Sequence, residues 1–285
     1  MDMAIQEMPL AIFTTLAPIG AGAFIALAIA FFTGKYSNDQ LKIIDKFTVI
    51  PLILIVVGFA ASFFHLASPG KAFGVFAGLG SSPLSNEIAV GVVFTLAALL
   101  YWILALAGKL NEGARKGFVA VVAVLAVVFA CFTGLAYYVD TIPSWSTPAA
   151  PISIIGFALA GGAVLGALVL ALAGASEGEG VESAKKPLMI LLVVGAVLGL
   201  AGACMQFGAA SGITTAATSG AQLASSVAGY LGGFVVIFLA GAAIGAYALL
   251  KKMNVAMTAC AAIVVVIGVF LARLVFYALE ISIGL

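Results

Sequence analysis

The sequence contains eight apolar runs that are each long enough to cross the hydrocarbon core of a bilayer, which takes about 20 residues in a helix. Hydrophobic residues make up 64% of the chain and charged residues 8%, whereas a soluble domain carries roughly a quarter charged residues. The sequence therefore predicts an integral membrane protein. The runs cover approximately residues 9–33, 47–67, 87–108, 117–139, 151–174, 187–209, 227–250 and 255–280.

The length and uniformity of these runs favour helices. Backbone N–H and C=O groups must be paired inside lipid, which excludes open strands, and the runs are too long and too uniformly apolar for barrel strands. We expect an all-α bundle of eight transmembrane helices that forms a single transmembrane domain over residues 1–285. The first residues include Asp2 and Glu7 but no Lys or Arg, so we expect a retained helix rather than a cleaved signal peptide.

The basic residues predict the orientation of the bundle. Ten of the twelve Lys and Arg residues lie in the odd-numbered connections between runs. By the positive-inside rule these connections are cytoplasmic, so both termini face the periplasm of a bacterial inner membrane. We expect their charges to be solvated, with no buried polar set in the cytoplasmic half. The ten are Lys35, Lys42, Lys46, Lys109, Arg115, Lys116, Lys185, Lys186, Lys251 and Lys252.

The ionisable residues within or beside the runs gather at the predicted periplasmic end. Ionisable groups in a transmembrane segment are costly and usually functional. Arg273, the one basic residue inside a run, shares a helix face with Tyr277, four residues later. We expect Arg273 to pair with a carboxylate. The carboxylates at this end are Glu87, Asp140 and Glu280, and the single histidine, His65, ends the second run.

A lipid-soluble ligand that exchanges protons, such as a quinol, fits this pattern. A neutral imidazole at His65 can accept a proton, and Glu87 can pass one to water. Lys71 or Arg273 can stabilise the developing negative charge of the ring. The alternative interpretations are a hydrogen bond from His65 to a carbonyl, a helix-dipole role for Glu87, and a snorkelling Lys71.

Resident redox cofactors are not expected in this protein. One histidine cannot provide both axial ligands of a b-type haem, and the isolated Cys131, Cys204 and Cys260 do not group as a metal or iron–sulfur site requires. We expect these cysteines to be small core residues. Electrons taken from a quinol must then leave through a cofactor on another polypeptide. The apolar or small-residue outer connections 68–86, 140–151 and 209–226 are candidates for its docking surface.

Several segments resemble the membrane anchor subunits of the dimethyl sulfoxide reductase family. The pair 65–69 (HLASP) and 84–89 (LSNEIA), in this order, is the most specific. The resemblance extends over the whole chain and also includes 9–14 (PLAIFT), 71–73 (KAF), 140–145 (DTIPSW), 205–206 (MQ) and 273–277 (RLVFY).

The resemblance implies a menaquinol-oxidising anchor for anaerobic respiration, with menaquinol bound near the periplasmic face. Electrons would pass to an iron–sulfur subunit and then to a molybdopterin catalytic subunit, both on that face, so the chain itself would not act on the terminal acceptor. The family's motif histidine and glutamate correspond to His65 and Glu87. The family often has Arg where this chain has Lys71, and Lys cannot make a bidentate planar contact.

The sequence leaves two other functions open. A small-solute transporter would place polar groups near the bilayer midplane, whereas here they gather at one face. A purely structural anchor would bind no quinol. Nothing in the sequence indicates a nucleic-acid partner.

Overall fold

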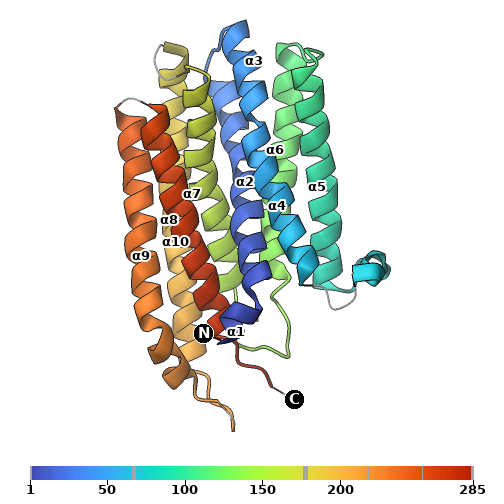
Figure 1. The fold of residues 1–285 in the computed structure, drawn as a ribbon, viewed down its shortest axis with the longest axis vertical. Helices are drawn as coiled ribbons and strands as arrows, with labels where there is room; N and C mark the ends of the chain where they lie inside the picture. The colour runs from blue at the N-terminus through green and yellow to red at the C-terminus, as the bar shows by residue number, and fades with distance from the viewer. Residues whose placement is uncertain (1, 66–68, 176–178, 217, 252, 284–285) are drawn as a thin grey trace.

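The structure, a computed structural model, describes residues 2–65, 69–175, 179–216, 218–251 and 253–283. It contains eight helical segments long and apolar enough to cross a membrane, aligned in one bundle (Figure 1), and this confirms the predicted all-α fold. The helices are α1 (Asp2–Gln6), α2 (Met8–Thr33), α3 (Asn38–Phe47), α4 (Val49–Phe64), α5 (Pro83–Leu106), α6 (Glu112–Leu135), α7 (Ala149–Leu172), α8 (Glu179–Ser211), α9 (Gly220–Leu250) and α10 (Val255–Ala278), with a 3₁₀ helix η1 (Pro69–Gly78) between α4 and α5.

Several helices extend beyond the apolar runs. A capping side chain pairs the free N–H groups at the start of a helix, so the helix can begin in the polar region outside the apolar run. The helix α5 begins at Pro83, and the Ser82 hydroxyl accepts a hydrogen bond from the Ser85 N–H at 3.4 Å, a normal N-cap. The second membrane segment runs from Asn38 to Phe64 as α3 and α4 together. As a result, side chains that the sequence places in connections belong to helices.

The helices α2 and α7 form the centre of the bundle. The helices α4 and α6 pack on α2, while α8 and α10 pack on α7; α5 then packs on α6, and α9 on α10 (Figure 1). The contacts among the first four spans are thus repeated among the last four. Three spans lie between α2 and α7 in the sequence, so α2 and α7, and with them the two halves, run in the same direction. The sequence has no recognisable internal repeat, so this relation appears in the structure alone.

The contact between α2 and α7 requires two glycines. A Cβ atom placed on Gly162 would lie 2.1 Å from the carbonyl carbon of Gly22, and one on Gly22 would lie 1.8 Å from the Ala158 oxygen. Such contacts allow the two backbones to approach closely. By contrast, Gly229 and Gly233, which lie four residues apart in α9, face open space.

Both termini lie at one end of the bundle, and the basic connections lie at the other (Figure 1). The charge-based assignment of these two ends to periplasm and cytoplasm stays a prediction. The cysteine prediction is wrong for two of three residues, since Cys204 and Cys260 are exposed on the outside of the bundle. A small apolar residue is compatible with a lipid-facing position as well as with a core.

The outer connections differ in how firmly they are held. Residues 140–151 fold against the end of α10, where Trp145 stacks on Phe276 with ring centroids 5.4 Å apart. Between α8 and α9, an antiparallel bridge joins Thr214 to Ser219. The 3₁₀ helix η1 instead projects from the side of the bundle, the cyan segment at the lower right of Figure 1.

We expect Gly162→Ala to separate α2 from α7, because its Cβ would meet backbone atoms that cannot rotate away. Overpacking of this kind costs about 1–3 kcal/mol, so the midpoint of thermal unfolding of the purified protein should fall. The matched control is Gly233→Ala, whose Cβ enters open space. Equal midpoints for the two variants would contradict the assigned role of Gly162.

Candidate functional site

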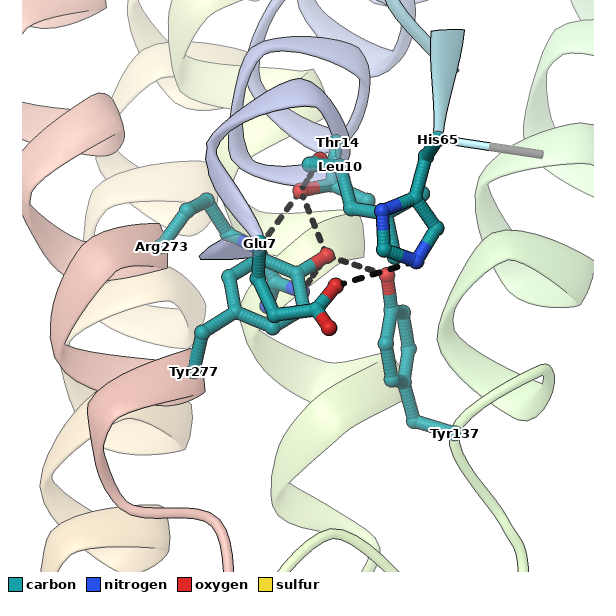
Figure 2. A network of polar contacts seen from close by, with 7 residues as sticks. All are labelled: Glu7, Leu10, Thr14, His65, Tyr137, Arg273 and Tyr277. Atoms are coloured by element: carbon teal, nitrogen blue, oxygen red, sulfur yellow. Dashed lines mark hydrogen bonds and ion pairs between the residues drawn. The ribbon is translucent and has the colours of Figure 1, made fainter. Parts of the chain in front are cut away.

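A network of buried hydroxyls surrounds Arg273 at the end of the bundle that carries the termini (Figure 2). Arg273 Nε donates to Thr14 Oγ1 at 2.8 Å, and Arg273 Nη2 donates to Tyr277 Oη at 3.3 Å. The hydroxyl of Tyr277 also hydrogen-bonds the hydroxyl of Tyr137. Thr14 in turn donates to the Leu10 carbonyl at 2.7 Å. The network therefore joins α2, α10 and the segment that follows α6.

Aromatic rings surround the Arg273 guanidinium. Its Cζ atom lies 4.0 Å from the Phe276 ring centroid, 5.0 Å from that of Tyr277 and 5.1 Å from that of Tyr137. Positions 273, 276 and 277 share a face of α10 because they are three and four residues apart. The negative faces of these rings attract the cation.

The predicted ion pair between Arg273 and a carboxylate is wrong for the described side chains, none of which places a carboxylate oxygen within 4.0 Å of Arg273. Glu280 instead accepts a hydrogen bond from the Ser282 hydroxyl at 2.8 Å, and Asp140 is exposed. Ring faces and hydroxyl oxygens solvate the guanidinium in place of a carboxylate.

Glu87 is buried in α5, with 3% of its surface exposed. It lies beyond the first turn, which contains no acidic residue, so the helix-dipole interpretation does not explain it. Its Oε1 atom and the Oγ1 atom of Thr133 in α6 are both buried and close enough to affect each other, but neither makes a hydrogen bond of normal geometry to a described residue. An unpaired buried polar atom costs about 1–3 kcal/mol. The Glu87 carboxyl is also close enough to Arg273 to interact with it electrostatically.

His65 faces a carboxylate that the sequence reasoning did not consider. His65 follows the last turn of α4, and its Nε2 atom lies 3.4 Å from Oε2 of Glu7 at the start of α2 (Figure 2). The His65 side chain is 37% exposed and that of Glu7 17%. Burial raises the pKa of Glu7 above its usual value, the charge of His65 opposes this shift, and the charge of Glu280 adds to it. Glu7 is thus a better proton acceptor than an ordinary surface carboxylate.

A wall of phenylalanines closes the site toward the bundle interior. Phe13 of α2, Phe59 of α4 and Phe129 of α6 contact one another with centroid distances of 5.1–6.3 Å. Phe94 of α5 stacks on Phe129 at 5.5 Å. Flat apolar surfaces of this kind pack well against aromatic rings.

The structure brings most of the predicted site residues to one end of the bundle. His65, Glu87, Arg273 and Tyr277 all lie there, in α5, α10 and the end of α4. Lys71 belongs to η1, but its side chain lies outside the described part of the structure.

Four residues of this site were missed by the sequence reasoning: Glu7, Thr14, Thr133 and Tyr137. The signal that could have found them is helical spacing, because residues four or seven apart lie on one face of a helix. Glu7 and Thr14 are seven residues apart, and Thr133 and Tyr137 are four apart. Burial raises the pKa of the Tyr137 phenol well above its usual value, so the phenol keeps its proton.

The opposite end also contains buried charges, contrary to the expectation that its charges are solvated. Arg115 Nη1 donates to Asp45 Oδ1, and both side chains are buried. The Trp102 Nε1 atom donates to the Asp45 carbonyl oxygen at 3.0 Å. The expectation failed because α3 and α6 continue past the apolar runs and turn these two residues toward each other.

Comparison with known proteins identifies relatives over the whole sequence. The family model described as DMSO reductase anchor subunit (DmsC) matches residues 1–279. The C subunit of the anaerobic dimethyl sulfoxide reductase of Escherichia coli (strain K12) is 29% identical over 283 residues, which cover 98% of this protein and 97% of that subunit.

Two further relatives match over part of their length. The YnfH subunit of an anaerobic dimethyl sulfoxide reductase of Escherichia coli (strain K12) is 34% identical over 165 residues, 58% of either protein. The C subunit of the anaerobic dimethyl sulfoxide reductase of Haemophilus influenzae is 32% identical over 146 residues, 51% of this protein and 52% of the relative. In these two cases the matched segment spans little more than half of the relative.

We expect Arg273→Lys to destabilise the protein by about 1–3 kcal/mol, because an ammonium cannot stack on Phe276 while donating to both Thr14 and Tyr277. The measurement is the thermal unfolding midpoint in detergent. Thr14→Val should add little loss in the Arg273→Lys background, since the shared hydrogen bond is already gone.

The matched control for this cycle is Thr95→Val, whose hydroxyl donates to Gly91 in its own helix. Its effect should add to that of Arg273→Lys. If the loss of stability caused by Thr14→Val added in full to that caused by Arg273→Lys, the hydrogen-bond network around Arg273 would be contradicted.

Proposed function

The protein belongs to the DMSO reductase anchor subunit family, and on that premise we propose that it oxidises menaquinol at the periplasmic face of a bacterial inner membrane for a dimethyl sulfoxide reductase-type complex. The observation that carries the proposal is that a buried cation and a buried carboxylate lie near each other without forming an ion pair. Arg273 has no carboxylate within 4.0 Å among the described side chains, and Glu87 keeps an unpartnered oxygen close to it. A quinol offers hydroxyl groups to the carboxylate and a developing negative charge to the cation.

Oxidation of one quinol releases two protons and two electrons and leaves a quinone. We assign the proton from one hydroxyl to Glu87 and that from the other to His65, whose neutral imidazole can act as a base. Both electrons would leave through an iron–sulfur cluster of a partner subunit, which would supply the one-electron acceptor that the reaction needs. Turnover therefore requires electron transfer to that partner.

The surrounding groups position the ring. Arg273, held by Thr14 and Tyr277, supplies a fixed positive charge that favours the deprotonated hydroxyl. Tyr277 and Lys71 complete the proposed set of quinol-binding residues. The Thr133 hydroxyl, which lies beside Glu87 and makes no hydrogen bond of normal geometry to a described residue, supplies one further hydrogen bond in this scheme, and the phenylalanine wall contacts the apolar part of the ring.

Protons leave through Glu7 in this scheme. The Glu7 carboxylate lies 3.4 Å from His65 and is partly exposed, and its raised pKa brings its proton affinity closer to that of an imidazole. A proton accepted by His65 can pass to Glu7 and then to water. Because this exit lies at the end that carries the termini, the proton that His65 accepts is released at that end.

The partner subunits would bind at the same end. We propose an iron–sulfur electron-transfer subunit in contact with this face and a molybdopterin catalytic subunit beyond it. The projecting η1 and the residues after it expose Phe76 and Leu79, apolar side chains that a docked subunit would cover. Electron transfer needs the iron–sulfur subunit near His65 and Glu87, and η1 lies between these two residues in the sequence.

We expect His65→Ala and Glu87→Gln each to lower menaquinol-dependent turnover of the purified complex by about 100-fold or more, the usual contribution of a positioned acid or base. Reduction of the terminal acceptor with a soluble dye as electron donor bypasses the anchor and should stay normal, showing that the complex is assembled.

The control for these variants is Glu182→Gln, an exposed carboxylate at the opposite end. Normal quinol turnover in both site variants would refute the quinol site. A complex that contains no quinone and shows no quinol-dependent turnover would identify a purely structural anchor. Isolation of the wild-type protein without any iron–sulfur protein would favour a transporter.

We expect the rate of menaquinol oxidation to fall on acidification as Glu7 becomes protonated. The pKa of Glu7 is raised, so this fall should occur at a higher pH than for an ordinary glutamate. In Glu7→Gln the part of this fall that is due to Glu7 should disappear, leaving only the loss of the His65 base, and the rate at neutral pH should drop about tenfold or more. The matched control is Asp140→Asn, an exposed carboxylate at the same end. An unchanged pH profile in Glu7→Gln would exclude Glu7 from the proton path.

A further inference from the structure

A large cavity opens at the end of the bundle that carries the basic connections, at the opposite end from the proposed quinol site. Its volume is about 860 Å³, within the usual range of about 300–1,000 Å³ for ligand sites. It lies between the turn that joins α2 to α3 and the turn that joins α5 to α6. Neither the proposed quinol oxidation nor the helix packing uses this space.

The lining of the cavity carries an excess of positive charge. Its basic side chains are Lys35, Lys42, Arg115 and Lys116, against two acidic ones, Asp45 and Glu112. The acidic groups are already engaged, because Asp45 binds Arg115 and Glu112 lies 2.7 Å from Lys116.

Two lining groups remain available to a ligand. Lys35 has no ion pair within 4.0 Å among the described side chains, although its charge reaches Glu112. The Tyr36 hydroxyl is buried without a hydrogen-bond partner in the described part of the protein. Burial raises the pKa of Tyr36 above its usual value, so the hydroxyl keeps its proton and can donate it. A free cation beside an unpartnered donor is suited to an anionic oxygen.

Exposed apolar side chains border the same cavity. Phe32 at the end of α2 is 59% exposed, and Leu106 at the end of α5 is 48% exposed, and both line the cavity. These residues lie at the ends of two membrane segments, so in a bilayer they would lie where acyl chains meet headgroups. A small anion from solution would leave both apolar side chains uncovered, whereas a phospholipid would contact them with its chains.

We propose that this cavity binds the headgroup of an anionic phospholipid. The phosphate contacts Lys35 and the Tyr36 hydroxyl, with Lys116 near it, and the acyl chains run along Phe32 and Leu106 toward the hydrocarbon core. Basic pockets between transmembrane helices are known to hold such headgroups. The bound lipid would fill the space between α3 and the α5–α6 hairpin and so connect two parts of the first half of the bundle.

The test uses the full-length protein in detergent, titrated with phosphatidylglycerol or with phosphatidylcholine of the same acyl chains, and bound lipid is counted by native mass spectrometry. We expect one phosphatidylglycerol to bind with clear preference. Lys35→Gln should weaken its binding about fivefold, the usual effect of one basic residue near a membrane surface. Tyr36→Phe, which removes only the unpartnered oxygen, should weaken it as well.

Lys186→Gln is the matched control, because it removes an exposed lysine from another basic connection at the same end, and it should leave binding unchanged. A thermal unfolding midpoint in phosphatidylcholine equal to that of the wild type shows that a variant is folded. Because Lys35 is exposed, Lys35→Gln provides the test even if Tyr36→Phe is unstable.

Three results would overturn the proposal. The first is equal binding of the two lipids. The second is equal weakening by Lys186→Gln and Lys35→Gln, which would indicate general surface charge. The third is full displacement of phosphatidylglycerol by inorganic phosphate at comparable concentration, which would identify a soluble anion as the ligand.

Discussion

The close contact of α2 with α7 determines how the rest of the bundle is arranged. Hydrophobic burial does not drive helices together in lipid, so their association depends on close packing and hydrogen bonds. Gly22 and Gly162 let these two backbones meet, and every other span packs directly or through one neighbour on this pair. The helix α10 packs on both α7 and α2, which places Arg273 beside Thr14. The candidate site thus lies where the two halves of the bundle meet.

Polar groups are concentrated at the two ends, and each end satisfies its charges in a different way. At the end with the termini, aromatic faces and hydroxyls surround Arg273, while Glu87 keeps an unpartnered oxygen. At the opposite end Asp45 and Arg115 pair directly. A buried polar atom without a partner costs stability, so the end that contains Glu87 is suited to binding a ligand that supplies the missing partner. The direct pair of Asp45 and Arg115 is suited to holding two helices together.

The sequence allowed a correct prediction of the eight-helix architecture because span length and apolar uniformity are local properties of the polypeptide. It also indicated that His65, Glu87 and Arg273 share one end, since each lies near the same side of its own run. The helix-dipole interpretation of Glu87 required knowing where α5 begins, and a single capping serine at position 82 decides that. The ion pair expected for Arg273 did not form, because the neighbours of a side chain in a bundle come from other helices.

Whether a feature of this protein depends on the sequence alone or on the tertiary structure follows from how far apart in the sequence the interacting residues lie. The sequence by itself determined the number of spans, the apolar faces they need, and the segregation of basic connections to one end, because each depends on residues within one run or its flanks. Only the tertiary structure decided that Glu7 faces His65, that Thr14 holds Arg273, and that Asp45 meets Arg115. These pairs join residues 58, 259 and 70 positions apart, and no local pattern specifies which faces of distant helices will touch.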